Sequence, residues 1–174
     1  MRYGRTIATA LLGVTLTALA WATPAGAAVA PDGTSARGEH CNIVLRKLQP
    51  GRSVSEVVAK DCDTDAAALA ERAPQGQILL STVFQHSGWK GLSVNIFGYD
   101  GPCDSAGYTF DTTSHNTAVE GISSYFVYNN CWYTVITNNA GAVDGNCWDI
   151  PYVGDAHNDQ VRKLHLRDGY WCNV

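Results

Sequence analysis

The stretch FQHSGWKG, residues 84 to 91, decides how the rest of the sequence is interpreted. Phe84 stands seven positions before Gly91, and Trp89 lies two positions before that glycine. A hairpin that folds back over its own sheet needs a residue with positive φ, and glycine adopts that conformation without a Cβ clash. The stretch is therefore either an ordinary turn or the folded hairpin that opens a β-sandwich motif. The sequence on either side of it distinguishes these two alternatives.

The sequence after this stretch consists of short apolar segments separated by Gly, Asn and Asp, as expected for short strands joined by turns. In LSVNIF, residues 92 to 97, apolar and polar side chains alternate, as in a strand with one buried face. The region from Ile78 to the end therefore predicts an all-β sandwich whose strands read ILLSTVFQH, LSVNIFG, ISSYFVY, CWYTVIT, NCWDIPYV and VRKLHLR.

The upstream flank predicts a small extension over residues 41–77. CNIVLRKL and SVSEVVAK are two expected strands around the turn sequence QPGR. DAAALAERA follows as a short helix, with Asp65 as its N-cap and Pro74 ending it. The expected organisation is a hairpin and helix at 41–77, followed by a β domain at 78–174.

The amino terminus has the pattern of a secretory signal peptide. Arg2 and Arg5 precede an apolar run and the small residues of TPAGA, so we expect a signal peptide at 1–27 and a disordered leader at 28–40. The remaining chain has 174 − 27 = 147 residues and a net charge of (12 − 2) − 16 = −6. A secreted, extracellular chain is predicted, without membrane insertion. The acidic balance argues against nucleic acid as a partner.

The six cysteines all follow the predicted signal peptide. An even number in an oxidising compartment predicts three disulfides, each worth about 2–5 kcal/mol in a small secreted domain. The sequence does not choose among the pairings, except that Cys41 and Cys62 bracket the first hairpin and are expected to pair. The cysteines assigned to disulfides are Cys41, Cys62, Cys103, Cys131, Cys147 and Cys172.

The β region contains two stretches that resemble one another. GISSYFVYNNC and NDQVRKLHLRDG each follow a glycine-rich loop, while Gly91 and Gly145 occupy comparable early positions. Two repeats of about 40 to 50 residues, each too small to bury its own face, predict two motifs packed together.

FQHSGWKG, EGISSY and YVGDAHNDQVRKLHL together resemble the βγ-crystallin-like domains, in which two Greek-key motifs form a β-sandwich. The resemblance covers about residues 78 to 168. It implies that Phe84 opens the first hairpin, that Gly91 lets the hairpin fold back beside Trp89, and that Ser124 fixes it by hydrogen bonding. The second motif departs from the pattern, because Ile136 stands where the aromatic is expected and its hairpin is longer.

The resemblance also implies calcium as a candidate ligand, although no cofactor is required. The matching segments are residues 119–124 and 158–163, and Ser123 with Asp159 could form one weak site. Arg162 puts a cation where the second site needs a hydroxyl. The alternative is that Ser123 and Asp159 cap turns and that Arg162 pairs with a carboxylate. DCDTD at 61–65 has EF-hand-like spacing, but it lacks the later glycine and glutamate and fits the start of the helix better.

No catalytic residue is predicted. CDSAG at 103–107 is similar to the nucleophile loop of trypsin-like proteases, but Ala106 replaces its glycine and the histidine and aspartate order does not fit. The acidic residues Asp100, Asp104 and Asp111 are turn residues on this interpretation.

The expected function is therefore binding, by a non-enzymatic and monomeric secreted domain. Several aromatic residues either pack in the sandwich or form a surface patch for a protein or a sugar: Trp132, Tyr133, Trp148, Tyr152, Tyr170 and Trp171. The resembled fold includes a bacterial metalloproteinase inhibitor and killer-toxin-like proteins, so the alternatives are an inhibitor of an extracellular peptidase and a toxin or antimicrobial protein acting at a cell surface. For an inhibitor, the predicted contact loop is NNAGAVDGNC, with Asn138, Asn139, Val143 and Asp144.

Overall fold

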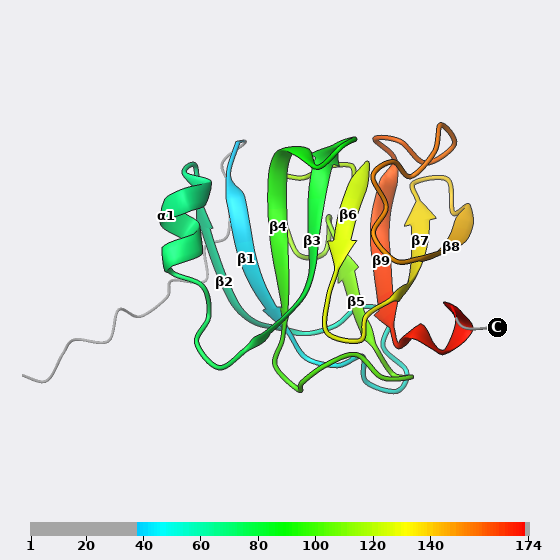
Figure 1. Cartoon of the computed structure of the whole chain (residues 1–174), viewed down its shortest axis with the longest axis horizontal. Coiled ribbons are helices and arrows are strands. Elements are labelled where there is room, and N and C mark those ends of the chain that lie inside the picture. The colour runs from blue at the N-terminus through cyan, green and yellow to red at the C-terminus, as the bar shows by residue number, and fades with distance from the viewer. Residues whose placement is uncertain (1–37, 173–174) are drawn as a thin grey trace, which may run out of the picture. The chain divides into compact units, whose positions relative to one another are not determined.

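Two β-sheets share one hydrophobic core in the computed structural model, which describes residues 38–172 (Figure 1). The predicted signal peptide and most of the predicted leader lie outside this range. The elements are β1 (His40–Leu45), β2 (Val57–Asp63), α1 (Ala66–Glu71), β3 (Ile78–His86), β4 (Lys90–Gly98), β5 (Tyr108–Asp111), β6 (Ser124–Val127), β7 (Tyr133–Asn138), β8 (Val143–Cys147), β9 (Val161–Arg167) and the 3₁₀ turn η1 (Gly169–Cys172). The prediction of a mainly β, disulfide-stabilised fold is confirmed.

The two sheets are built alike around a pair of hairpins. The first sheet has the order β2-β1-β4-β3-β6 and the second has the order β5-β9-β7-β8. In each, a later strand, β6 or β9, pairs with the first strand of the hairpin, β3 or β7. The first half of the β region runs from β3 to β6, and the second half runs from β7 to β9. β5 of the first half pairs with β9 in the other sheet, and Ile150 of the second half bridges to Tyr125 of β6. Each half therefore supplies a segment to the sheet of the other half.

The amino-terminal hairpin belongs to the first sheet. β1 pairs in parallel with β4, with Cys41 opposite Val94 and Ile43 opposite Ile96. The side chains of Cys41, Ile43 and Leu45 are fully buried in the common core. Within the predicted hairpin-helix extension at 41–77, β1 and β2 thus belong to the same sheet as the later strands, and β1 contributes to the common core.

The predicted helix forms and begins where expected. The carboxylate of Asp65 accepts hydrogen bonds from the backbone N–H groups of Ala67 and Ala68, as an N-cap does. The helix ends at Glu71, before Pro74. Arg72 beyond it binds the carboxylates of Asp61 (2.8 Å) and Asp63 (2.9 Å), so the acidic string at 61–65 caps and pairs within the fold.

Some of the strand predictions agree with the structure and others do not. β3 and β9 have the predicted bounds. β5 was not predicted: its four residues YTFD alternate aromatic and polar side chains but form a short strand in which all four are buried. The predicted strand NCWDIPYV is wrong: β8 ends at Cys147, and the residues after it make only the isolated bridge at Ile150.

Three disulfides join neighbouring parts of the fold. Cys41 pairs with Cys62 across β1 and β2, which confirms that prediction. The other two bonds are Cys103–Cys131 and Cys147–Cys172. The former connects the β4–β5 loop to the β6–β7 loop, and the latter connects the end of β8 to η1.

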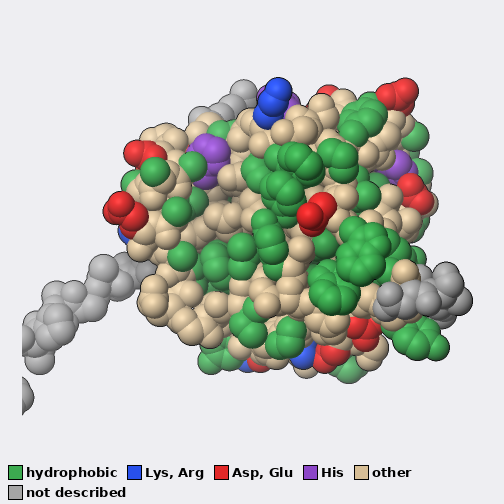
Figure 2. Space-filling view, in the orientation of Figure 1, with side chains coloured by type: hydrophobic (Ala, Val, Ile, Leu, Met, Phe, Trp, Pro, Cys, Tyr) green, Lys and Arg blue, Asp and Glu red, His purple; other side chains and the backbone are tan. Residues whose placement is uncertain are grey.

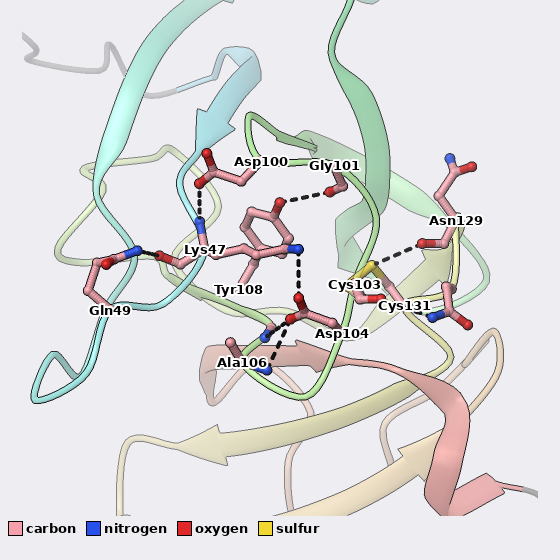
Figure 3. A network of polar contacts seen from close by, with 12 residues as sticks. Lys47, Gln49, Asp100, Gly101, Cys103, Asp104, Ala106, Tyr108, Asn129 and Cys131 are labelled. Carbon is pink, nitrogen blue, oxygen red and sulfur yellow. Dashed lines mark hydrogen bonds and ion pairs between the residues drawn. A yellow bond between two sulfur atoms is a disulfide. The ribbon is translucent and has the colours of Figure 1, made fainter.

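A polar network surrounds Cys103–Cys131 and fixes the β4–β5 loop (Figure 3). The Nζ of Lys47 binds the Asp104 carboxylate at 2.7 Å, and this bond is the main reason that the pKa of Asp104 lies below its usual value. Asp104 also accepts from the backbone N–H groups of Ala106 and Gly107, so CDSAG forms a turn. The hydroxyl of Tyr108 donates to the Gly101 carbonyl at 2.7 Å, and burial raises the pKa of Tyr108 to about 12.

Candidate binding surface

The hairpin between β3 and β4 is tied down by one buried serine. The hydroxyl of Ser124, which is fully buried, donates to the carbonyl of His86 at 2.6 Å and accepts from the backbone N–H of Trp89 at 3.0 Å. Gly91 has φ of +79°, and a Cβ there would stand 2.7 Å from the His86 ring. These contacts hold the hairpin against β6, so that Trp89 is displayed in a fixed position.

Trp89 covers a cluster of aromatic rings on the outer side of the first sheet. Its indole stacks on Phe126, with centroids 4.5 Å apart and planes within 16°. Phe126 meets Phe84 edge to face at 5.8 Å and lies 6.3 Å from Tyr128. Trp89 remains 39% exposed, so one face of its ring is backed by Phe126 while part of the indole is open to solvent.

A second aromatic cluster lies at the carboxyl end of β8. Trp132 and Trp148 have ring centroids 5.2 Å apart, and the N–H of Trp148 donates to the Trp132 carbonyl at 2.9 Å. The two side chains are 38% and 47% exposed. Trp148, like Trp89, has positive φ, at 68° and 61° respectively. Both tryptophans therefore adopt a backbone conformation that is rare for bulky side chains.

The segment after Trp148 connects the two clusters. It runs beside β6, where Ile150 pairs with Tyr125 and the Asp149 carboxylate accepts from the Val127 N–H at 2.8 Å. The N–H of Gly88 at the hairpin tip donates to the carbonyl of Pro151 at 2.8 Å. Figure 2 shows one hydrophobic group over β6 and another beside β7, with an acidic side chain between them. We call this surface the aromatic face and define it by Phe84, Trp89, Phe126, Tyr128, Trp132 and Trp148.

The expected aromatic patch is thus present in part, with other members than the sequence suggested. Tyr152 and Tyr170 are exposed, but Tyr133 is only partly so, and the side chain of Trp171 lies outside what the structure describes. Phe126, Tyr128 and Asp149 were missed. The signal for Phe126 and Tyr128 is present in SYFVY, where they alternate with the buried Tyr125 and Val127, whereas nothing in the sequence marks Asp149.

The predicted calcium pair is brought together by the fold. The hydroxyl of Ser123 donates to one carboxylate oxygen of Asp159 at 3.0 Å, and the amide of Asn158 donates to the other at 2.7 Å. Gly121 lies against the same turn, since a Cβ there would stand 2.4 Å from the Asp159 carbonyl. Within residues 38–172, no group of three or more His, Cys, Asp and Glu side chains is arranged to hold a metal ion.

The second, imperfect calcium segment is occupied by ion pairs. The Nε of Arg162 lies 3.6 Å from the buried carboxylate of Asp111, and the Nζ of Lys163 lies 4.0 Å from it. Arg162 therefore pairs with a carboxylate, as the alternative interpretation of this segment predicted. At the other candidate position, the Ser123 hydroxyl and the Asp159 carboxylate lie side by side, and none of the ion pairs between described residues involves Asp159.

The loop predicted to contact a peptidase is mostly a hairpin. Asn138 is buried, and its side chain accepts from the N–H groups of Ala140 and Ala142 and donates to the carbonyl of Ala156. Asn138 therefore shapes the turn and cannot touch a partner, which corrects that assignment. Val143 and Asp144 are exposed but lie on β8, and Asn139 is exposed in the turn.

The histidine contacts hold strands together. The Nδ1 of His40 lies 2.8 Å from the Ser93 hydroxyl and joins β1 to β4. The Nδ1 of His165 lies 2.8 Å from the Thr109 hydroxyl and joins β9 to β5. His115 is buried, accepts from the Asp111 N–H and reaches the Ser55 carbonyl, and burial lowers its pKa. This pattern is that of a neutral imidazole with Nε2 protonated.

Comparison of the chain with protein-family models, with curated proteins and with solved structures finds no match. In the part of the chain that the structure describes, no helix is long and apolar enough to cross a membrane. The features available for a functional assignment are thus the strand order, the folded hairpin and the aromatic face.

Proposed function

We propose that this chain is a secreted, non-enzymatic binding protein of βγ-crystallin type, and that it contacts a protein partner through the aromatic face. The type is supported by the similar topology of the two halves of the β region. In each half a hairpin is followed by a segment that pairs with the other sheet, β5 or the bridge at Ile150, and then by a strand that pairs with the hairpin, β6 or β9. It is also supported by Ser124, which bonds to the hairpin from the position that the resemblance assigns to it. Three disulfides are consistent with an extracellular location.

One observation carries the choice of surface: two exposed tryptophans are held in strained backbone conformations. Positive φ costs on the order of 1–3 kcal/mol for such a residue, and surrounding structure has to sustain it. Both indoles nevertheless keep a large part of their surface open to solvent, since Trp89 and Trp148 are 39% and 47% exposed. Strain of this kind concentrates at functional sites, and Trp is the residue most enriched in the energetic centres of protein interfaces.

The surface is also built to lose little entropy when a partner binds. Trp89 is fixed by Ser124 and by its stacking on Phe126, and Trp148 is tied to Trp132. Cys147, adjacent to Trp148, is bonded to Cys172. Side chains that are already ordered have less freedom to give up, so more of their contact energy appears as affinity.

The test is to replace the three exposed tryptophans by alanine and to measure the affinity for the protein partner. A triple variant, Trp89→Ala with Trp132→Ala and Trp148→Ala, and the wild type are used to isolate partners from the growth medium of the producing cells. Affinity is then measured with each purified partner, extracellular peptidases included. We expect the triple variant to bind at least about tenfold more weakly. Tyr170→Ala removes an exposed ring outside the aromatic face and should bind normally. Equal binding by the triple variant would refute the proposal.

A weak calcium site is the second candidate, favoured by the contact between Ser123 and Asp159. Calcium that binds only the folded state must raise its unfolding temperature. Thermal unfolding of the oxidised protein is compared with calcium and with a chelator, in the wild type and in Asp159→Asn. A rise of several degrees in the wild type alone supports the site, and no calcium-dependent rise removes it.

A further inference from the structure

In the part of the chain that the structure describes, the adjacent residues Tyr99 and Asp100 together hold an arginine. The guanidinium carbon of Arg46 lies 4.5 Å from the ring centroid of Tyr99, and its Nη1 lies 3.6 Å from the carboxylate of Asp100. Ring and carboxylate come from adjacent residues, so one dipeptide supplies both a π face and a negative charge. The two contacts act on the same guanidinium, through a cation–π interaction and an ion pair.

The dipeptide Trp148-Asp149 repeats this pattern on the aromatic face, with both side chains exposed. One carboxylate oxygen of Asp149 accepts from the Val127 N–H. None of the ion pairs between described residues involves Asp149. Trp132, 5.2 Å from Trp148, adds a second indole to the same place. The pair thus has the ring and the carboxylate of the Tyr99–Asp100 arrangement, and among residues 38–172 no arginine is recorded in an ion pair with Asp149 or over the Trp148 ring.

We propose that Trp148 and Asp149, with Trp132, bind an arginine side chain presented by the protein partner. This inference rests on the proposed function and specifies the chemistry of the partner at one point. Charge complementarity supports it, because the chain carries a net charge of −4 and the exposed Asp149 adds a carboxylate directly after Trp148. Tryptophan is the strongest cation–π acceptor among the side chains. Arginine fits better than lysine, because its planar guanidinium stacks on a ring while its N–H groups reach a carboxylate.

The proposal can be tested on the intact oxidised protein with short peptides. The probe is acetyl-GRGRG-amide, and its binding is followed by tryptophan fluorescence and by chemical shifts of the indole N–H groups. Two further peptides replace arginine by lysine, which keeps the charge, or by citrulline, which keeps the shape and removes the charge. Because these changes are in the probe, they leave the fold of the protein untouched.

Asp149→Asn is the matching change in the protein. Asparagine keeps an oxygen that accepts from the Val127 N–H, so only the charge is lost. Asp144→Asn is the control, since it removes the same charge from an exposed position on β8. We expect Asp149→Asn to weaken binding of the arginine peptide roughly tenfold, as for loss of a charged hydrogen bond, and Asp144→Asn to leave it within about twofold. The indole shifts should concern Trp148 and Trp132.

Several results would overturn the inference. They are equal affinity for the arginine and lysine peptides, equal loss in the two aspartate variants, and indole shifts confined to Trp89. If chitohexaose binds at Trp148 in preference to the arginine peptide, the site is a sugar-binding site. If the protein forms concentration-dependent dimers that Asp149→Asn abolishes, the ligand of the site is a second copy of this chain. If a partner depends on the three tryptophans but is indifferent to Asp149→Asn, the binding function stands and the arginine assignment fails. If no partner is found, the function fails instead.

Discussion

Gly91 and Gly141 share a backbone conformation but differ in their surroundings. Their φ angles are +79° and +83°. A Cβ at Gly91 would meet the His86 ring at 2.7 Å, whereas nothing lies within 4 Å of a Cβ at Gly141. The two positions therefore separate the cost of the conformation from the cost of the contact.

We expect Gly91→Ala to destabilise the protein more than Gly141→Ala. Both changes impose a left-handed conformation on a side chain, at about 1–2 kcal/mol each. Only Gly91→Ala also has to displace His86 from the folded hairpin. The measurement is urea unfolding of the two oxidised variants. Equal loss of free energy of unfolding in both would show that the His86 contact is accommodated without cost.

A pH dependence follows from the buried histidines. Burial lowers the pKa of His115 from 6.5, with smaller opposing effects of the Ser55 carbonyl and Asp111, and it lowers the pKa of His165 as well. Between 6.5 and the lower folded pKa, the unfolded chain binds a proton that the folded chain does not. The contribution of the neutral histidines to the free energy of unfolding is therefore fully present above pH 6.5, and it is lost as the pH falls through this window.

The check is chemical unfolding at several pH values from about 7 down to about 5. His115→Asn keeps an acceptor for the Asp111 N–H and removes the titrating ring. We expect the variant to have a smaller loss of stability on acidification than the wild type. The same slope in both proteins would mean that His115 does not contribute to it.

Some of the candidate surface follows from sequence and some does not. Phe84, Gly91 and Ser124 are assigned by the resemblance to βγ-crystallin-like domains, and only the need for a glycine at the positive φ of position 91 follows from a local requirement. Trp148 could be listed as an aromatic, but nothing local in NCWDI indicates positive φ or contact with Trp132. Asp149 joins the face only because Ile150 pairs with β6, which is a long-range contact.

At the scale of elements, a row of polar side chains crosses the outer side of the first sheet. The Asn42 amide donates to the carbonyl of Leu69 in α1 at 3.0 Å, and its oxygen accepts from Asn95 of β4 at 3.0 Å. The hydroxyl of Thr82 in β3 donates to Asn95 at 2.9 Å. This row fixes the helix and three strands relative to one another.

Asn42→Ala is expected to cost about 1–3 kcal/mol, because it removes the buried bond from Asn42 to the Leu69 carbonyl, which keeps only the Arg72 N–H, and takes away the Asn42 acceptor of the Asn95 amide. Amide exchange in α1 should accelerate with it. Asn139→Ala, at an exposed turn, is the control and should change little. Unchanged exchange in α1 would show that the helix is held by other contacts.

The parallel pairing of β1 with β4 is the element-scale feature that sequence could not supply. Alternation predicts that a segment is a strand, but it does not name the neighbour across about 50 residues of chain. The hairpin of β1 and β2 looked self-contained because its turn and its disulfide are both local. Its buried residues Ile43 and Leu45 show that it completes a core shared with later strands.

For the whole molecule, this arrangement predicts that the β region does not fold without the hairpin. A fragment of residues 78–174 lacks Ile43 and Leu45, each worth about 1.5–3 kcal/mol of burial, and exposes the edge of β4. Such losses are a large share of the 5–15 kcal/mol typical of a domain. We expect a cooperative thermal transition for residues 38–174 and none for 78–174. A cooperative transition in the shorter fragment would restore the division at residue 77.

The order of the disulfides has a consequence for how the protein matures. The first cysteine pairs with the second, the third with the fourth and the fifth with the sixth, at separations of 21, 28 and 25 residues. No bond interleaves with another. In a chain that enters an oxidising compartment with its amino end first, both cysteines of one native pair are present before the first cysteine of the next pair enters. Simple consecutive oxidation therefore yields the native connectivity, with no need for reshuffling by an isomerase.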